Sequence, residues 1–170
     1  FKAKYPQTPT LTAADLACRD KLSAITSNVK LVDMNLSTWR SLWNNYDELA
    51  SFMKAKGLTL ADTYNYYMSL IGEQRALADA HNKSILDLKG ECSLTSIYSE
   101  WGAAYDYSSK IRDLVSQTQD FISAQYALFK AKYPQTPTLT AADLACRDKL
   151  SAITSNVKLV DMNLSTWRSL

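Results

Sequence analysis

The side chains that could perform chemistry are few, and they form no recognisable site. His81 is the only histidine of the chain, and on a predicted helix close to the buried stripe we expect it to be a polar packing residue. Carboxylates recur along a later predicted helix, at Glu100, Asp106, Asp113 and Asp120. We interpret them as a solvated face, because a di-metal helical bundle uses Glu-x-x-His motifs and the sequence has none. Phosphate-binding, HExxH and EF-hand motifs are also missing, so we predict no catalytic, cofactor-binding or metal-binding residue and no enzyme.

Cysteine is the other reactive residue type. The chain has three cysteines, and Cys146 is the copy of Cys18 in a duplicated stretch. Neither Cys18 nor Cys92 belongs to a CxxC motif or a Cys/His cluster, which gives no support for zinc binding or thioredoxin-like chemistry. We therefore expect buried free thiols. Free thiols fit a reducing compartment, although the pattern leaves an extracellular location open.

The helices that would position these side chains are organised by a repetition. Residues 1–42 recur letter for letter at residues 129–170, so that Phe129 repeats Phe1. Repetition at a fixed period is typical of natural tandem arrays. In that interpretation the chain holds one complete unit, residues 1–128, and a third of the next, identical unit. The alternative is a deliberate duplication, in which residues 43–170 are a circular permutant of residues 1–128.

Composition and charge exclude several classes of protein. Hydrophobic residues make up 46% of the chain and charged residues 21%, which is typical of a globular protein. The net charge of +2 arises because the basic third is present twice, and one 128-residue unit carries 13 basic and 14 acidic side chains. A nearly neutral unit gives no electrostatic support for nucleic-acid binding. No apolar run approaches the roughly 20 residues that a membrane-spanning helix needs, so we also expect no membrane insertion.

Start and stop signals divide the chain into helices. Thr12 and Thr59 each precede an aspartate by three residues, at Asp15 and Asp62, which resembles a capping box. Gly57 is a helix stop, and the two PQTP sequences interrupt helices because proline lacks an N–H. We expect helices near 13–56, 60–89 and 94–133, with either a turn, which we favour, or a helical linker at 89–93.

These signals also define the domain organisation. They give the tail of a preceding unit with its PQTP breaker at 1–12, a helical repeat unit at 13–133, a second breaker at 134–140, and the first helix of the next, identical repeat at 141–170. Neighbouring identical repeats are thus the first partners that we expect.

An apolar seam dominates the first predicted helix. Its members alternate at spacings of four and three residues, and they are Cys18, Leu22, Ile25, Val29, Val32, Leu36, Trp39, Trp43, Tyr46, Ala50 and Met53. This heptad spacing predicts a long amphipathic helix that packs at coiled-coil angles. Flanking leucines widen the stripe, which suits a bundle, and Trp101 lies on the corresponding stripe of the last helix of the unit. We predict an elongated all-α fold of long antiparallel helices in a three-helix or four-helix bundle.

The tryptophan-bearing part of the first helix resembles the spectrin-like repeat family. The sequence VKLVDMNLSTWRSLWNNYDEL, residues 29–49, is similar to the family's helix that carries a Trp followed three residues later by a Leu, here Trp39 and Leu42. Trp101 resembles the family's other helical tryptophan. The 128-residue unit is longer than the usual one, and the PQTP breaker is not part of the family pattern. The resemblance implies a cytoskeletal or membrane-skeletal spacer, although helical stalks of surface adhesins share these features.

We therefore expect a structural module that acts as a rod-like spacer or a protein-interaction platform, with a cytoskeletal location favoured over the cell surface. Its expected partners are identical repeats, a cytoskeletal or other protein, and a second chain in a homodimer formed by helix swapping. Tyr66 and Tyr105 lie off the buried stripes, so we predict that they belong to an interaction surface. Two alternatives remain: an engineered switch in which the two copies exchange on one scaffold, and a helical bundle that binds an apolar ligand.

Overall fold

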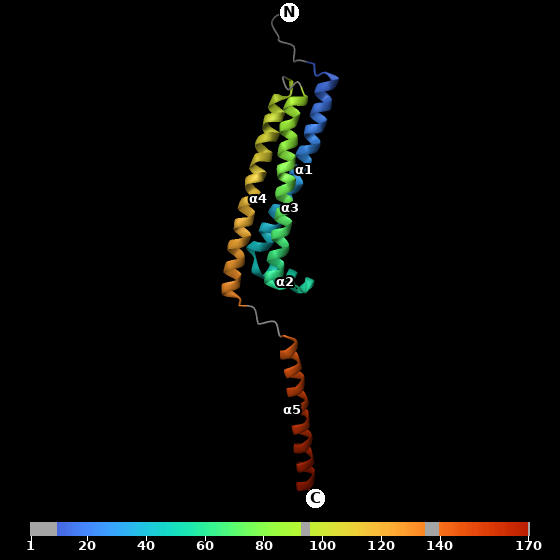
Figure 1. Ribbon diagram of the computed structural model, residues 1–170, viewed down its shortest axis with the longest axis vertical. Coiled ribbons are helices and arrows are strands. Elements are labelled where there is room, and N and C mark those ends of the chain that lie inside the picture. The colour runs from blue at the N-terminus through green and yellow to red at the C-terminus, as the bar shows by residue number, and fades with distance from the viewer. Residues whose placement is uncertain (1–9, 93–95, 135–139, 170) are drawn as a thin grey trace, which may run out of the picture. The chain divides into compact units, whose positions relative to one another are not determined.

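The computed structural model describes residues 10–92, 96–134 and 140–169 (Figure 1). The chain divides into a first unit, Phe1–Tyr133, and a second unit, Pro134–Leu170. All regular elements among the described residues are helices: α1 (Ala13–Asn44), α2 (Tyr46–Lys56), α3 (Leu60–Glu91), α4 (Tyr98–Lys132) and α5 (Ala141–Arg168). The predicted all-α bundle is thereby confirmed.

Three of the long helices, α1, α3 and α5, begin at a capping box. Thr12 Oγ1 accepts a hydrogen bond from the Asp15 N–H at 3.1 Å, and the Asp15 carboxylate accepts one from the Thr12 N–H at 2.9 Å. The same reciprocal pair opens α3 at Thr59 and α5 at Thr140. Each pair satisfies two backbone donors that the first turn of a helix would otherwise leave without a partner.

The first predicted helix, 13–56, is divided into two in the structure. Asn45 adopts an extended conformation, with φ −126° and ψ 109°, which ends α1. Its side chain then accepts a hydrogen bond from the Asp47 N–H at 3.0 Å and caps α2. The seam continues through Trp43 and Tyr46 on either side of the break, so periodicity alone does not reveal it. Asparagine favours such caps because its side chain competes with the helical backbone for hydrogen bonds.

The turn predicted at 89–93, after the second predicted helix, separates two helices, although α3 continues to Glu91. α3 ends at Glu91, Cys92 is extended with φ −111° and ψ 142°, and α4 begins at Tyr98. Residue 93 of the predicted turn lies outside the described residues, as do residues 94 and 95 of the predicted 94–133 helix. A single long helix through residues 89–93 is thus wrong, and the 94–133 segment begins as α4 a few residues later than predicted.

The first unit is a bundle in which α1, α3 and α4 pack against one another along their length, while α2 packs on α1 (Figure 1). α1 and α4 run in one direction and α3 runs in the other. The start of α1 contacts the end of α3 and the start of α4, through Cys18–Cys92 and Arg19–Glu100. The end of α1 contacts the end of α4, where Trp43 stacks on Phe129. The chain therefore enters the bundle at one end and leaves it at the other.

The predicted seam faces the interior of this bundle. Its buried members are Leu22, Val29, Val32, Leu36, Trp43 and Met53, and its half-buried members are Cys18, Ile25, Trp39, Tyr46 and Ala50. Trp101 of α4 is buried in a smaller apolar cluster together with Leu22, Ile85, Leu88 and Ala104. The larger cluster fills the rest of the bundle and contains Trp43, Tyr67 and Phe129.

The second unit consists of one described helix. α5 has the same sequence as α1 over Ala13–Arg40. None of its described residues is buried. The second unit therefore exposes the part of the apolar stripe that it shares with α1 of the first unit.

Candidate interaction site

The described residues offer no cluster suited to a metal ion. No group of three or more His, Cys, Asp or Glu side chains among them could hold a metal ion. His81 is half-buried, and desolvation lowers its pKa. Of the carboxylates on α4, Glu100 forms an ion pair with Arg19 at 2.7 Å. Within the same described part of the chain, no helix is both long and apolar enough to cross a membrane.

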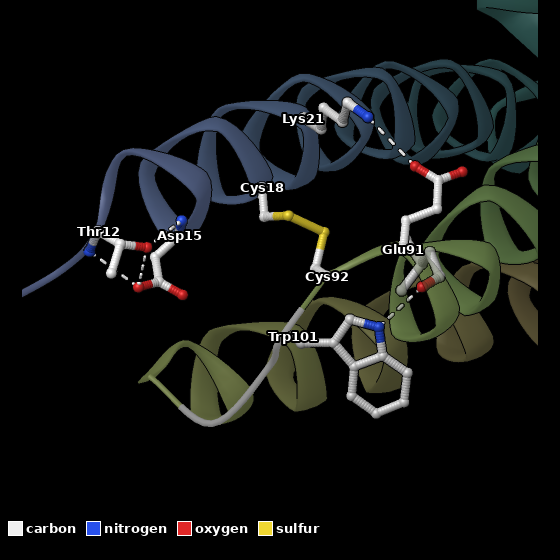
Figure 2. Close-up of a disulfide and its surroundings, with 8 residues drawn as sticks. Thr12, Asp15, Cys18, Lys21, Glu91, Cys92 and Trp101 are labelled. Carbon is white, nitrogen blue, oxygen red and sulfur yellow. Dashed lines mark hydrogen bonds and ion pairs between the residues drawn. A yellow bond between two sulfur atoms is a disulfide. The ribbon is translucent and has the colours of Figure 1, made fainter.

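A disulfide closes the end of the bundle at which α1 begins. Cys18 of α1 and Cys92, directly after α3, are bonded, with their Cα atoms 6.1 Å apart (Figure 2). The expectation of free thiols is therefore wrong for this pair. The two residues are 74 positions apart, so no local motif marks them, and only the antiparallel packing of α1 on α3 brings them together. Cys146, the copy of Cys18, is a free and exposed cysteine.

Ion pairs beside the disulfide attach α1 to both other long helices. Lys21 Nζ lies 3.2 Å from a carboxylate oxygen of Glu91 at the end of α3 (Figure 2). Arg19 pairs with Glu100 at the start of α4. Trp101 joins α4 to α3 at the same end, because its indole Nε1 donates a hydrogen bond to the backbone carbonyl of Ile85 at 2.7 Å. The start of α1 is thus held by one covalent bond and two charge pairs.

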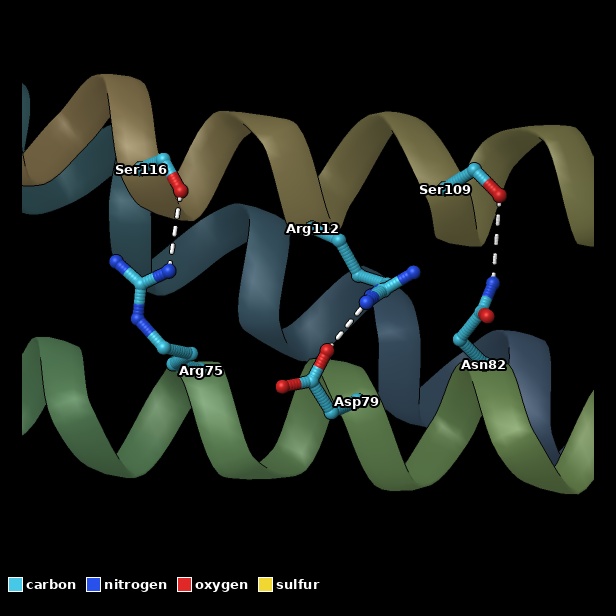
Figure 3. Close-up of polar contacts among 6 residues, drawn as sticks. All are labelled: Arg75, Asp79, Asn82, Ser109, Arg112 and Ser116. Carbon is cyan, nitrogen blue, oxygen red and sulfur yellow. Dashed lines mark hydrogen bonds and ion pairs between the residues drawn. The ribbon is translucent and has the colours of Figure 1, made fainter.

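Polar side chains fix the register of α3 on α4. The Arg112 guanidinium donates to the Asp79 carboxylate at 2.6 Å, Arg75 donates to the Ser116 hydroxyl at 3.1 Å, and the Asn82 amide donates to the Ser109 hydroxyl at 3.3 Å (Figure 3). The charged pair is about half exposed, and such pairs contribute up to about 1 kcal/mol. The α3–α4 hairpin is therefore an ordered surface that receives α1.

α1 also contacts that hairpin through polar groups near its middle. The Tyr107 hydroxyl donates a hydrogen bond to the Asp33 carboxylate at 2.8 Å, and the Asn35 amide donates to the Gln74 side-chain carbonyl at 3.3 Å. Burial and the nearby Asp33 carboxylate together raise the pKa of Tyr107 to about 12. A groove of about 480 Å³ runs beside this contact between α1 and α4.

The structure does not bring the two predicted interaction tyrosines together. Tyr66 is 50% exposed near the start of α3, where its ring contacts Tyr67. Tyr105 is half-buried near the start of α4 and stacks on Trp101, with ring centroids 5.5 Å apart. Because α3 and α4 are antiparallel, these positions belong to opposite ends of the bundle. Tyr66 is an exposed surface residue, whereas Tyr105 covers the smaller apolar cluster.

An exposed apolar surface runs along α5 instead. We call it the α5 apolar face, and it consists of Leu150, Ile153, Val157, Val160, Leu164 and Trp167, which are between 48% and 77% exposed. Leu36 of α1 and Leu164 of α5 occupy the same position of the repeated sequence. Leu36 is fully buried, whereas Leu164 is 48% exposed. A contiguous apolar stripe of this kind is typical of an interaction surface.

Comparisons with known proteins add no relative. No family model matches the chain, and neither a curated protein nor a solved structure matches it. The resemblance to spectrin-like repeats therefore stays a prediction. Three features of the molecule bear on its function: the repetition, the topology of the first unit and the α5 apolar face.

Proposed function

We propose that the chain is a structural module of a tandem-repeat protein, in which each helical unit acts as a rod-like spacer. The observation that carries this proposal is the path of the chain through the first unit. Three long helices, α1, α3 and α4, cross the bundle alternately, so the chain enters at Ala13 and leaves at Lys132, at the opposite end. A unit with this path, repeated in series, moves the chain forward instead of returning it to its starting point.

The length of α4 sets the distance gained by each unit. α4 contains 35 residues, which corresponds to roughly 52 Å at the helical rise per residue. The next copy of the repeated stretch begins at Phe129, in the last turn of α4, and α5 starts with the same capping box as α1. An array of such units would therefore lengthen, with each unit added, by roughly this length of one long helix.

The incomplete second unit supports the same proposal. An amphipathic helix hides its stripe only by packing on a partner, and repeat proteins supply that partner from the neighbouring sequence. In the first unit, α1 packs its stripe on α3 and α4. α5 has the sequence of α1 and an exposed stripe, so a copy of the α3–α4 hairpin after Leu170 would complete a second bundle.

The disulfide affects the proposed location of the array. Disulfides persist in oxidising surroundings and are rare in the cytosol. The Cys18–Cys92 bond therefore favours a stalk at a cell surface or in a secreted protein over the cytoskeletal rod that the resemblance implies. The alternative of a bundle that holds an apolar ligand in its interior is less favoured, because Trp43, Tyr67 and Phe129 fill that interior.

The proposal is tested by extending the chain with a second copy of residues 43–170, directly after Leu170. Small-angle scattering would compare the maximum dimension of the extended and original chains, with mass determination to confirm that both are monomers. We expect an increase that fits one further folded bundle in line, with the helical content rising in proportion. An extended chain that is no longer than the original, or one whose added residues remain unfolded, would overturn the spacer function.

A further inference from the structure

We infer that the α5 apolar face is a docking site for the α3–α4 hairpin of a second copy of this chain, where Cys146 forms a disulfide with the second copy's Cys92. The inference goes beyond the spacer function, since it assigns a partner in another molecule to a surface. The docking would also occur in a chain that does not act as a spacer.

Sequence identity between α5 and α1 carries the choice of partner. α1 recognises the hairpin through one disulfide, two ion pairs and two polar hydrogen bonds, which Cys18, Arg19, Lys21, Asp33 and Asn35 provide. α5 has each of these residues at the same position of its sequence, as Cys146, Arg147, Lys149, Asp161 and Asn163. The charges, the thiol and the apolar stripe of α5 are therefore complementary to the hairpin as it stands in the first unit.

The hairpin of the same chain is out of reach. To replace α1 there, α5 would have to begin near Cys92, at the end of the first unit opposite to Lys132. That distance is close to the length of α4, roughly 52 Å for its 35 residues. The segment from Lys132 to Ala141 spans at most about 32 Å when fully extended. A hairpin that receives α5 must therefore come from another molecule, which also argues against a switch on a single scaffold.

Docking proceeds by thiol–disulfide exchange, which needs no external oxidant. The Cys146 thiol is free and exposed, and its thiolate attacks the Cys92 sulfur of the second copy's Cys18–Cys92 disulfide. The Cys146–Cys92 bond forms as the Cys18–Cys92 bond breaks. Cys18 leaves as a thiolate and takes up a proton equivalent to the one that Cys146 lost. One disulfide is consumed and one is formed, so the electrons balance.

Competition with α1 decides how far the exchange proceeds. α5 carries the residues that α1 uses up to Arg40, but it has no counterpart of Trp43, which packs on Tyr67 and Phe129. α1 is also tethered to the hairpin by its own chain and so has a high effective concentration. The original chain should therefore exchange slowly and reversibly. A change that weakens α1 and leaves α5 unchanged should shift the equilibrium toward the docked dimer.

The repetition supplies a matched pair of variants for this test. Leu36→Ala removes a fully buried side chain from α1, which would favour docking of α5 by a factor on the order of 30 or more. Leu164→Ala makes the same change at the corresponding position of α5. Both full-length variants would be incubated in glutathione buffer, and the covalent dimer would be quantified on non-reducing gels. Cys18 and Cys146 lie in identical peptides, so the mass of a linked peptide does not show whether the linkage joins two chains. Equal mixtures of ¹⁵N-labelled and unlabelled chains would identify intermolecular linkages by mass spectrometry.

We expect at least ten times more covalent dimer for Leu36→Ala than for Leu164→Ala, and loss of that dimer when Cys146→Ser is added. Equal yields for both variants, or a dimer that survives Cys146→Ser, would overturn the inference. Circular dichroism would check that Leu36→Ala remains helical, and Val29→Ala with Val157→Ala is a milder matched pair for the same comparison. A dimer with these properties, together with an extended chain that fails to lengthen, would leave the docking site standing and remove only the spacer function.

Discussion

Leu36 and Leu164 occupy the same position of the same sequence in different surroundings. Leu36 is fully buried and Leu164 is 48% exposed. Leu36→Ala should lower the free energy of unfolding by about 2–5 kcal/mol, because it leaves a cavity in a packed core. Leu164→Ala should change it by less than about 0.5 kcal/mol. Urea denaturation of each variant, followed by circular dichroism, measures the difference, and equal destabilisation by the two substitutions would contradict the packing of the two units.

Asp33 and Asp161 form a second matched pair, which concerns the ionisation of Tyr107. Burial and the Asp33 carboxylate raise the pKa of Tyr107 from 10 to about 12. Because the folded-state pKa lies above the unfolded one, this stabilisation is complete below about pH 10 and is lost as the pH rises toward 12. Asp33→Asn removes the negative charge, so it should lower the pKa of Tyr107.

Ultraviolet absorbance of tyrosinate, followed against pH, measures that change. Asp33→Asn should shift one tyrosine of the ten to ionisation at lower pH. Asp161→Asn, the same substitution in α5, should leave the titration curve unchanged. Tyr107→Phe in the Asp33→Asn background identifies the tyrosine that shifts, and a shift that persists without Tyr107 would contradict the assignment.

At the scale of the helices, the disulfide holds α1 against α3. Cys18 and Cys92 are 74 residues apart, and closing a loop of that length stabilises a fold by about 4 kcal/mol when only the chain entropy of the unfolded state is considered. The double variant Cys18→Ser with Cys92→Ser should therefore unfold at a markedly lower urea concentration. Cys146→Ser is the control and should leave the midpoint unchanged, since Cys146 has no disulfide partner within its own chain. Unchanged stability of the double variant would show that noncovalent contacts alone hold α1.

Local signals predicted the helices well where they depend on one segment of the chain. The Thr-x-x-Asp boxes set the starts of α1 and α3, and Gly57, with φ 64°, ends α2. The break at Asn45 was missed because the apolar seam continues across it. Asn44-Asn45 followed by Asp47 and Glu48 contains a cap and an acidic first turn, and this signal could have located the start of α2.

Tertiary features were harder to predict because they combine distant segments. The disulfide has no local motif, but the sequence contained a usable distance argument. The sequence separation between Cys18 and Gly57 is nearly the same as that between Gly57 and Cys92. A hairpin that turns at Gly57 therefore places both cysteines near the same end of the bundle. Helical phase places both Tyr66 and Tyr105 off the stripes, yet it does not indicate that Tyr105 stacks on Trp101 or that the two tyrosines lie at opposite ends of the bundle.

At the scale of the whole molecule, the repeated stretch and the hairpin are present in unequal numbers. The described chain has two copies of the α1 sequence and one α3–α4 hairpin. A further copy of residues 43–170 adds one copy of the α1 sequence and one α3–α4 hairpin. The number of α1-type helices therefore stays one greater than the number of hairpins, however many copies are added. A chain lengthened by copies of residues 43–170 would present one helix that can dock on a further hairpin, which joins the proposed spacer to the inferred association between chains.

That arithmetic predicts the number of free thiols. The original chain has one disulfide and one free cysteine, Cys146. Extension by a second copy of residues 43–170 adds two cysteines, the copies of Cys92 and Cys146. If α5 packs on the added hairpin as α1 packs on the first, Cys146 pairs with the added copy of Cys92, and only the last cysteine stays reduced. Thiol titration of purified chains in denaturant should therefore find one free thiol per chain both before and after extension. Three free thiols in the extended chain would mean that α5 does not take the place that α1 holds in the first unit.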